Sequence, residues 1–308
     1  MNITRLRVAS TLLAVVTTFA ALPAANAIVN PDRNVLPGEA AWTAMITLEF
    51  DDSDPIQFCT GALVSPQIVL TAAHCVIDTP IEAVVIRVGN QTTASGDGVT
   101  RTAAAVIFHG KYERQMSYEI YDANEVLLET VEGDVRPGEN AIDSDIALIY
   151  LDKPILTIKP VRLPSSRNYQ PKSGWRTYGW GSTGENQDIE TDYLLTAAQD
   201  DHTAATAQSF GDPFEKILAA VRVNGESSSG TCFGDSGGPL VDRRNILIGL
   251  TSFSESGICS APVATLFTKV SAFLDWQKRA VTLAKKAVSN RAFKDARQES
   301  DIPVIGLE

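Results

Sequence analysis

The stretch Gly234-Asp235-Ser236-Gly237-Gly238-Pro239, with Cys232 just upstream, determines how the rest of this 308-residue chain is interpreted. Glycines on both sides of a serine let the backbone approach a substrate closely. A serine hydroxyl is a weak nucleophile until a base removes its proton, so the stretch predicts a histidine partner. The chain has three histidines, and His74 lies in the string Thr71-Ala72-Ala73-His74-Cys75. We therefore take Ser236 and His74 as a candidate nucleophile and its base.

Both strings resemble the two most distinctive motifs of the trypsin/chymotrypsin family of serine proteases. A third string, Asp143-Ser144-Asp145-Ile146-Ala147-Leu148-Ile149, resembles the Asp-Ile-Ala-Leu string of that family. By the mechanism worked out on this family, the resemblance implies that Ser236 attacks the scissile carbonyl, His74 takes its proton and Asp145 orients the imidazole. It also implies an oxyanion hole made by the backbone N–H groups of Gly234 and Ser236. The chain order His, Asp, Ser fits this family and differs from that of subtilisin-like and α/β-hydrolase enzymes.

The expected fold is all-β. The resemblance covers most of residues 28–270 and implies two six-stranded antiparallel β-barrels, with the active site in the cleft between them, plus a C-terminal helix. Runs of strand-forming residues at 42–50, 61–70, 84–88 and 103–108 agree with this fold. The expected divisions are a signal peptide (1–27), a first barrel half (28–151), a crossing linker (152–171), a second barrel half (172–270) and a C-terminal helix and tail (271–308), with the helix at 272–288.

Residues 111–143 depart from the family pattern. The run from Glu113 to Asp143 is acidic and lacks an obvious barrel strand, so we expect a solvated surface loop. Carboxylates are hard ligands that suit calcium, but the run lacks the spacing of an EF-hand loop. We therefore predict no metal and no other cofactor.

The first 27 residues have the pattern of a secretory signal peptide. Arg5 and Arg7 precede an apolar run from Val8 to Leu22, and the segment ends in Ala25-Asn26-Ala27, a typical cleavage site. The apolar run is shorter than the about 20 residues that a bilayer-spanning helix needs, so a membrane anchor is the weaker interpretation. We expect a secreted, extracellular protein.

Cleavage after Ala27 creates an N-terminus at Ile28, and Ile-Val starts resemble those of activated family members. There the freed ammonium pairs with the aspartate before the nucleophile, which is Asp235 in this sequence. A buried carboxylate needs a partner, so this pairing is physically reasonable. The family usually continues with two glycines, whereas this chain has Asn30-Pro31, and proline stiffens the segment. We predict an enzyme that is active on export, without a further propeptide.

Export also makes the four cysteines candidates for disulfides, and no Cys-x-x-Cys pair typical of metal sites is present. Four cysteines allow three connectivities, and their spacing alone leaves the choice open. The family resemblance implies the pairs Cys59–Cys75 and Cys232–Cys259.

The substrate pocket is the least determined part of the site. In relatives, the residue six before the nucleophile lies at the base of the pocket; here it is Gly230, which supplies no carboxylate for a Lys or Arg side chain. The resemblance places Thr265 on the inner wall and Ser252-Phe253-Ser254 along the substrate backbone. Thr265 and Ser254 would narrow the pocket. We therefore expect cleavage after small or medium apolar residues, a preference that Glu255 would reverse if its side chain pointed inward.

Composition narrows the possible partners. The net charge of −11 argues against nucleic-acid binding, and a hydrophobic content of 44% is ample for a buried core. We expect protein or peptide substrates and a monomer. His109 and His202 lie outside any motif and are expected at the surface. The basic run from Lys278 to Arg297 is expected to be the solvated face of the terminal helix with a frayed tail, rather than a contact with an anionic surface.

Two other functions share these sequence features. A non-catalytic binding module on a protease fold is a known fate of this family, but all three triad positions are filled here. A lipase or esterase of another fold is disfavoured because no helical pattern follows Gly-Asp-Ser-Gly-Gly. The sequence therefore favours a secreted serine endopeptidase.

Overall fold

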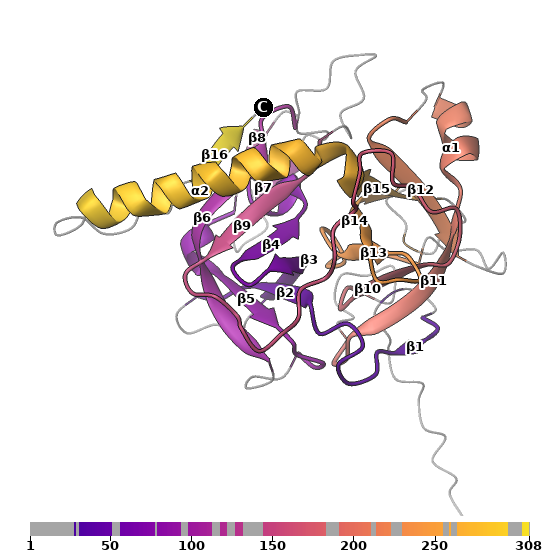
Figure 1. The fold of residues 1–308 in the computed structure, drawn as a ribbon, viewed down its shortest axis with the longest axis horizontal. Coiled ribbons are helices and arrows are strands. Elements are labelled where there is room, and N and C mark those ends of the chain that lie inside the picture. Colours follow the sequence, from indigo (N-terminus) through magenta and orange to yellow (C-terminus); the bar gives the residue numbers. More distant parts are fainter. Residues whose placement is uncertain are drawn as a thin grey trace, which may run out of the picture.

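The computed structural model of the chain describes residues 28, 31–50, 56–77, 79–93, 98–112, 118–121, 127–131, 144–182, 191–210, 214–222, 230–254, 259, 264–294 and 304–307. The predicted signal peptide, most of the acidic insertion and Glu255 lie outside the described residues. Two closed β-barrels stand side by side in Figure 1, as the resemblance implied.

Six antiparallel strands form the first barrel, drawn from indigo to magenta in Figure 1. Their order is β6-β5-β2-β3-β4-β9, and the pairing of β6 with β9 closes the barrel. The sequences VVIRV and ALIYL of two of these strands are rich in the branched residues that fill a barrel interior. The strands are β2 (Thr43–Leu48), β3 (Ile56–Ser65), β4 (Ile68–Thr71), β5 (Val84–Val88), β6 (Val99–His109) and β9 (Ala147–Leu151).

The second barrel is likewise antiparallel, with the order β11-β10-β13-β14-β15-β12, and β11 pairs with β12 to close it. A short N-terminal strand, β1 (Arg33–Asn34), adds to the edge of β11. This pairing ties the N-terminal segment to the second barrel. The barrel strands are β10 (Trp175–Gly179), β11 (Leu195–Asp201), β12 (Ile217–Arg222), β13 (Pro239–Val241), β14 (Leu247–Ser254) and β15 (Thr265–Lys269).

The C-terminal helix packs across the outside of the first barrel, against β6 and β9 (Figure 1). Its buried face includes Trp276 and Ala280, while Lys278 and Arg279 are exposed, as expected for a helix with one solvated face. The α-helix begins two residues later than predicted and continues to Lys294. The helical segments are η1 (Ala73–Cys75), η2 (Ile81–Ala83) and η3 (Val270–Phe273), which are 3₁₀ turns, and the α-helices α1 (Thr203–Phe210) and α2 (Leu274–Lys294). Among the described helices, none combines the length and apolarity that crossing a membrane requires.

The acidic insertion contains a hairpin that the sequence did not predict. Strands β7 (Tyr118–Tyr121) and β8 (Leu127–Val131) pair antiparallel as a separate two-stranded sheet. Their sequences, YEIY and LLETV, include aromatic and β-branched strand formers, which the acidic character of the whole run obscured. The hairpin joins neither barrel, in agreement with the expected lack of a barrel strand.

The last described residues form a strand that the sequence did not predict. Val304–Leu307 form β16, which runs parallel to β6 at Val106–His109. The partner β5 pairs with β6 only as far as Thr102, so the rest of that edge is open and β16 covers it. The indole Nε1 of Trp276 donates to the carbonyl of Leu307 at 2.8 Å and fixes the tail to α2.

His109 is not a surface residue, contrary to the prediction. It is only 8% exposed, because Phe273 and Trp276 pack against its ring. The burial follows from the position of the terminal helix, which no local pattern around His109 reveals. His202 is exposed, as expected.

Candidate active site

Two paired strands of the first barrel bring His74 and Asp145 together. Strand β4 leads into η1, which carries His74, and β9 begins just after Asp145, with Thr71 paired to Ala147. The Oδ2 atom of Asp145 lies 2.8 Å from His74 Nδ1, and Oδ1 accepts the backbone N–H of His74 at 3.0 Å. Because an ionised carboxylate only accepts hydrogen bonds, Nδ1 carries the proton and Nε2 keeps its lone pair.

The surroundings of this pair favour its charged forms. Burial of Asp145, which is 2% exposed, opposes its charge, but attraction to His74 and the hydrogen bonds that it accepts outweigh burial, so the pKa of Asp145 is lowered. One of those bonds comes from Ser252 Oγ, at 2.6 Å from Oδ2. Desolvation lowers the pKa of His74, but the charge of Asp145 and its hydrogen bond raise it more, and the net pKa is raised. The fixed carboxylate therefore makes His74 a stronger base.

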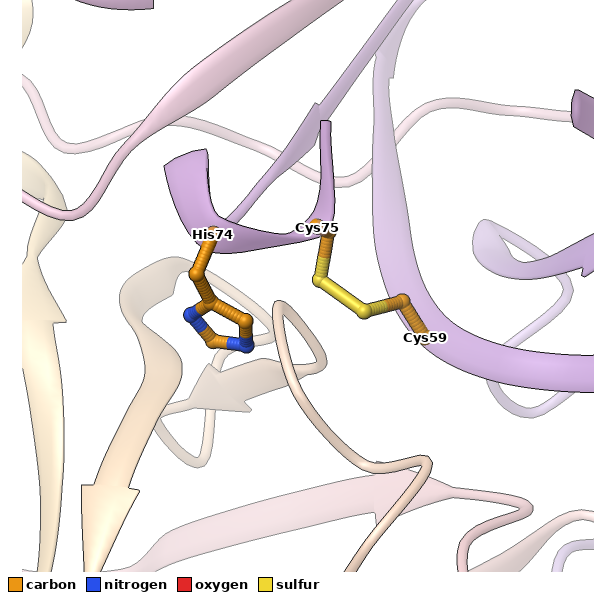
Figure 2. A group of neighbouring side chains, drawn as sticks. All are labelled: Cys59, His74 and Cys75. Atoms are coloured by element: carbon orange, nitrogen blue, oxygen red, sulfur yellow. A yellow bond between two sulfur atoms is a disulfide. The ribbon is translucent and has the colours of Figure 1, made fainter. Parts of the chain in front are cut away.

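Both disulfides implied by the family resemblance are present. Cys59 and Cys75 join β3 to the residue after His74, as Figure 2 shows. Cys232, just before the Ser236 string, is bonded to Cys259. The two sulfurs and a ring nitrogen of His74 all lie within 4.8 Å of one another. Sulfurs joined in a disulfide carry no thiolate to bind a metal, so this cluster is not a metal site.

Ser236 lies where the two barrels meet. Its carbonyl accepts the N–H of Thr60, in the first barrel, at 2.7 Å. A Cβ at Gly237 would lie 2.0 Å from Thr71 Oγ1 and 2.5 Å from Thr60 O, so this close approach requires the glycine. The contact sets the serine against the strands that lead into His74. Within the described residues no hydrogen bond joins Ser236 to His74; in free enzymes such bonds are often long and tighten when substrate binds.

The backbone N–H groups of the loop 234–238, which carries Ser236, differ in whether they donate hydrogen bonds within the protein. Those of Gly234 and Ser236, the expected oxyanion donors, make no hydrogen bond within the described residues. They are therefore free to donate to a substrate oxygen. Three others donate to backbone carbonyls of the protein: Asp235 to Cys232 at 3.0 Å, Gly237 to Thr251 at 2.7 Å and Gly238 to Asp235 at 2.8 Å.

Asp235 lies beneath this loop and is 1% exposed. Its carboxylate accepts the N–H of Gly181 at 2.9 Å and that of Cys232 at 3.0 Å. Burial raises the pKa of Asp235 to about 7 in spite of these two bonds. A Cβ at Gly181 would lie 2.6 Å from the carboxyl carbon, which explains the glycine. Asp235 has no ion pair among the described residues.

Ile28 is also fully buried, and its side chain packs against Leu195 and Ala197 of β11. Leu195 pairs with Gly179 of β10, and a Cβ at Gly179 would lie 1.9 Å from Asp235 Oδ1. A single pair of neighbouring strands therefore connects the Ile28 side chain to the Asp235 carboxylate.

The predicted pocket residues that are described gather on β14, β15 and the segment before the nucleophile. Thr265 pairs with Ser254 and is fully buried, and its hydroxyl lies 2.8 Å from that of Thr231, a residue that the sequence did not single out. Ser252 directs its hydroxyl to Asp145, so that side chain supports the His74–Asp145 pair. Phe253, between the two serines, is half-buried.

Two further residues that the sequence did not identify lie behind Gly230. A Cβ at this position would lie 2.6 Å from Gln199 Nε2 and 2.9 Å from Arg222 Cδ. Gln199 and Arg222 pair across β11 and β12, two strands that carry no motif. Near Asp145, the sequence also missed Tyr112, whose pKa is raised by burial and by the charge of Asp145.

These observations define a class of protein: a double-barrel fold in which the loop of Ser236 and the His74–Asp145 pair come from different barrels. The Trypsin family model matches residues 32–277, and the chain belongs to that family. It is therefore a serine endopeptidase that acts on protein or peptide substrates.

Relatives from insects and a bacterium agree with this assignment. The chain is 27% identical over 275 residues to a collagenase of Hypoderma lineatum, which covers 86% of this chain and 94% of that protein. It is 32% identical over 267 residues to phenoloxidase-activating factor 1 of Holotrichia diomphalia, covering 82% and 69%. A trypsin of Saccharopolyspora erythraea is 28% identical over 228 residues, covering 72% and 86%.

Proposed function

We propose that the chain is a secreted, monomeric serine endopeptidase in which Ser236 is the nucleophile, His74 the general base and Asp145 the residue that orients the base. The observation that carries the proposal is the 2.8 Å contact between Asp145 Oδ2 and His74 Nδ1, which leaves Nε2 available as a base. The Thr60–Ser236 backbone bond supports the proposal, because it holds Ser236 against the barrel that carries His74 and Asp145.

The proposed reaction follows the established mechanism of the family, carried over onto these positions. Ser236 Oγ attacks the carbonyl carbon of the scissile bond as its proton passes to His74 Nε2. The N–H groups of Gly234 and Ser236 donate to the oxyanion, and each such donor typically contributes about 3 kcal/mol. The C–N bond breaks, His74 returns the proton to the leaving amine, and an acyl-enzyme remains. Water, deprotonated by His74, then hydrolyses the ester and regenerates Ser236.

The proposed activation step pairs a free Ile28 ammonium with Asp235. Cleavage after Ala27 by the export machinery would create that ammonium, and Asp235 is a buried carboxylate that has no cation among the described residues. Ile28 has φ 58°, a left-handed conformation that costs a residue with a side chain about 1–2 kcal/mol. Cutting the preceding peptide bond removes this restriction. N-terminal sequencing of the exported protein is expected to give Ile28, and a start further upstream would indicate a precursor that needs another cleavage.

We further propose a preference for small or medium apolar side chains before the cleaved bond. Gly230 offers no carboxylate, and the Thr231–Thr265 hydroxyl pair is buried beside it. The aliphatic stem of Arg222 lies behind Gly230, while its guanidinium pairs with Asp32 at 3.3 Å. These groups favour a shallow, uncharged pocket. A panel of peptide substrates that differ only in this residue tests the preference, and cleavage confined to sites after Lys or Arg would contradict it.

The catalytic assignment is tested by labelling the mature protein with a peptidyl phosphonate. Mass spectrometry is expected to find the label on Ser236, and Ser236→Ala is expected to abolish both labelling and peptide hydrolysis. The matched control is Ser165→Ala at an exposed serine, which should leave both unchanged. A folded protein that binds peptides but neither takes the label nor cleaves them would instead be a non-catalytic binding module.

A further inference from the structure

We propose that Gln57 and Thr60 are positioning residues for the oxyanion hole, because both side chains cross from the first barrel to hold the carbonyl of Gly234. The proposal rests on the proposed catalytic role of the Ser236 loop. It adds a connection between the barrels that the catalytic triad does not provide. We call the pair of side chains Gln57 and Thr60 the carbonyl clamp.

The clamp consists of two hydrogen bonds to one acceptor. Gln57 Nε2 and Thr60 Oγ1 each lie 2.8 Å from Gly234 O, so both lone pairs of that carbonyl are used. Thr60 is fully buried, and its backbone N–H also donates to Ser236 O at 2.7 Å. Thr71 Oγ1 donates to the Thr60 carbonyl at 2.8 Å and fixes the clamp residue in turn. Thr60 therefore holds the loop on both sides of Asp235.

Gly234 is the point of the loop that most needs such support. Its φ of 90° lies in the left-handed region that glycine adopts without strain, and it has no side chain to limit rotation. Because peptide units are planar, fixing a carbonyl oxygen also fixes the N–H of the same unit. The carbonyl of Phe233 accepts the N–H of Ser182 at 2.6 Å, which fixes the peptide unit that contains the Gly234 N–H. The clamp fixes the next peptide unit, and together the two contacts determine φ and ψ of Gly234.

The consequence concerns the transition state more than substrate binding. Oxyanion donors act because they are oriented before charge develops on the substrate oxygen. Loosening the peptide unit that the clamp holds would change the orientation of the Ser236 N–H relative to the Gly234 N–H at that stage. An interaction made mainly in the transition state raises kcat without tightening substrate binding. Since Gln57 and Thr60 belong to the barrel that carries His74, the clamp also fixes the oxyanion hole relative to the general base.

The test compares substitutions that remove or keep the donor. Thr60→Val deletes the hydroxyl at nearly constant volume, and Thr60→Ser keeps it. We expect Thr60→Val to lower kcat on a peptide amide about tenfold, with KM changed by less than about twofold. A peptide aldehyde, whose adduct oxygen occupies the oxyanion hole, should bind weaker by the same factor. Thr60→Ser should restore most of both values.

Two further variants keep the test decisive. Thr43→Val makes the same change at a buried threonine of β2 and is expected to leave kcat unchanged. Gln57→Met removes the other donor from a half-buried position and carries the test alone if Thr60→Val does not fold. Unaltered kcat in both clamp variants, or an equal loss in Thr43→Val, would overturn the clamp. Ser236→Ala separates the two proposals. If Ser236→Ala is inactive while Thr60→Val keeps the kcat of the parent, the clamp alone is refuted. If Ser236→Ala is active, the proposed function is refuted.

Discussion

Asp145 and Asp235 are two carboxylates with nearly the same burial and opposite tendencies to ionise. They are 2% and 1% exposed, respectively, and each accepts hydrogen bonds from backbone N–H groups. Asp145 also faces the ring of His74 and the hydroxyl of Ser252, and its pKa is lowered. Asp235 has the backbone donors alone among the described residues, and burial raises its pKa to about 7. The presence of an ionisable partner, rather than burial, therefore decides which carboxylate is stably charged.

The difference corresponds to two tasks. Asp145 already has its partner, because His74 lies on the same barrel and requires no cleavage of the chain. Asp235 is incomplete while the chain continues before Ile28, because the cation that we propose for it appears only when that N-terminus is free. In the function that we propose, Asp145 takes part in catalysis directly, and Asp235 makes catalysis depend on processing of the chain.

The largest expected effect comes from removing the charge of Asp145. Asp145→Asn is expected to lower kcat by about four orders of magnitude, the loss known for this change in the family rather than one derived from the present geometry. The amide would stabilise the wrong tautomer of His74 and remove the charge that raises its pKa, so the acid limb of the kcat/KM profile should move to lower pH. Steady-state rates from pH 4 to 9 measure both the decrease in kcat and the shift of the acid limb.

The matched control for that variant is Asp242→Asn, because Asp242 is buried to a similar degree in the second barrel and bonds to Tyr169 instead of a histidine. It should keep kcat within about threefold of the parent while losing some stability. A comparable loss of rate in both variants would assign the effect to folding instead of to the His74–Asp145 pair.

The second effect is on stability, and it concerns Asp235 in the chain that retains residues before Ile28. A folded-state pKa raised to about 7 means that the neutral carboxyl is favoured on folding. The stability that this neutral carboxyl contributes is fully present below the unfolded pKa and is lost as the pH rises to about 7. The expected decrease in the free energy of unfolding is on the order of 4 kcal/mol, since each pKa unit corresponds to about 1.4 kcal/mol. Urea unfolding at pH 4, 5.5 and 7 measures it.

Asp235→Asn provides the control for the same experiment. The variant should lose that part of the pH dependence, because an amide does not ionise. The form that begins at Ile28 should also show a smaller decrease, since its ammonium favours the charged carboxylate. A decrease of equal size in the parent and in Asp235→Asn would show that another group is responsible.

The third effect is on activity and tests the same carboxylate from the side of the N-terminus. A form that retains Ala27 before Ile28 is expected to lose about a hundredfold in kcat/KM at pH 8 compared with the form that begins at Ile28. Leaving a buried charge without its partner typically costs about 3–5 kcal/mol. Protonation of Asp235, whose pKa is raised to about 7, limits the loss. Equal activity of the two forms would refute the proposed Ile28–Asp235 pair.

The sequence predicted those parts of the site that lie in short motifs with their own strand context. His74 follows a strand, Asp145 precedes another, and the two strands pair, so the motifs carry both the proposed chemistry and the placement of the two residues. The two disulfide pairs were implied by the family resemblance alone, and both are present.

The contacts that the sequence could not predict join segments that share no motif. Thr60 directly follows Cys59, but nothing local shows that its hydroxyl reaches Gly234, 174 positions further on. Arg222 and Gln199 meet behind Gly230 because two strands pair there. The burial of His109 depends on a helix from the other end of the chain. Each of these is a tertiary contact, for which composition and periodicity give no signal.

The smallest expected effect shows that the contributions of Asp145 and Asp235 to stability change with pH in opposite directions. Ser252→Ala removes the hydroxyl that donates to Asp145 at 2.6 Å. A hydrogen bond to a charged group contributes about 1.5–3 kcal/mol, so the variant should be destabilised by about 2 kcal/mol at pH 7.

The folded pKa of Asp145 is lowered, so the stability that its charged form provides is present above the unfolded pKa and disappears as the pH falls through the folded one. The destabilisation by Ser252→Ala should therefore shrink toward pH 3, whereas the contribution of Asp235 grows in that direction. Ser254→Ala, in the same strand and with a hydroxyl that bonds to no described residue, should show no such dependence. Urea unfolding of both variants at pH 3 and pH 7 decides the point: equal destabilisation by Ser252→Ala at the two pH values would mean that the bond does not depend on the charge of Asp145.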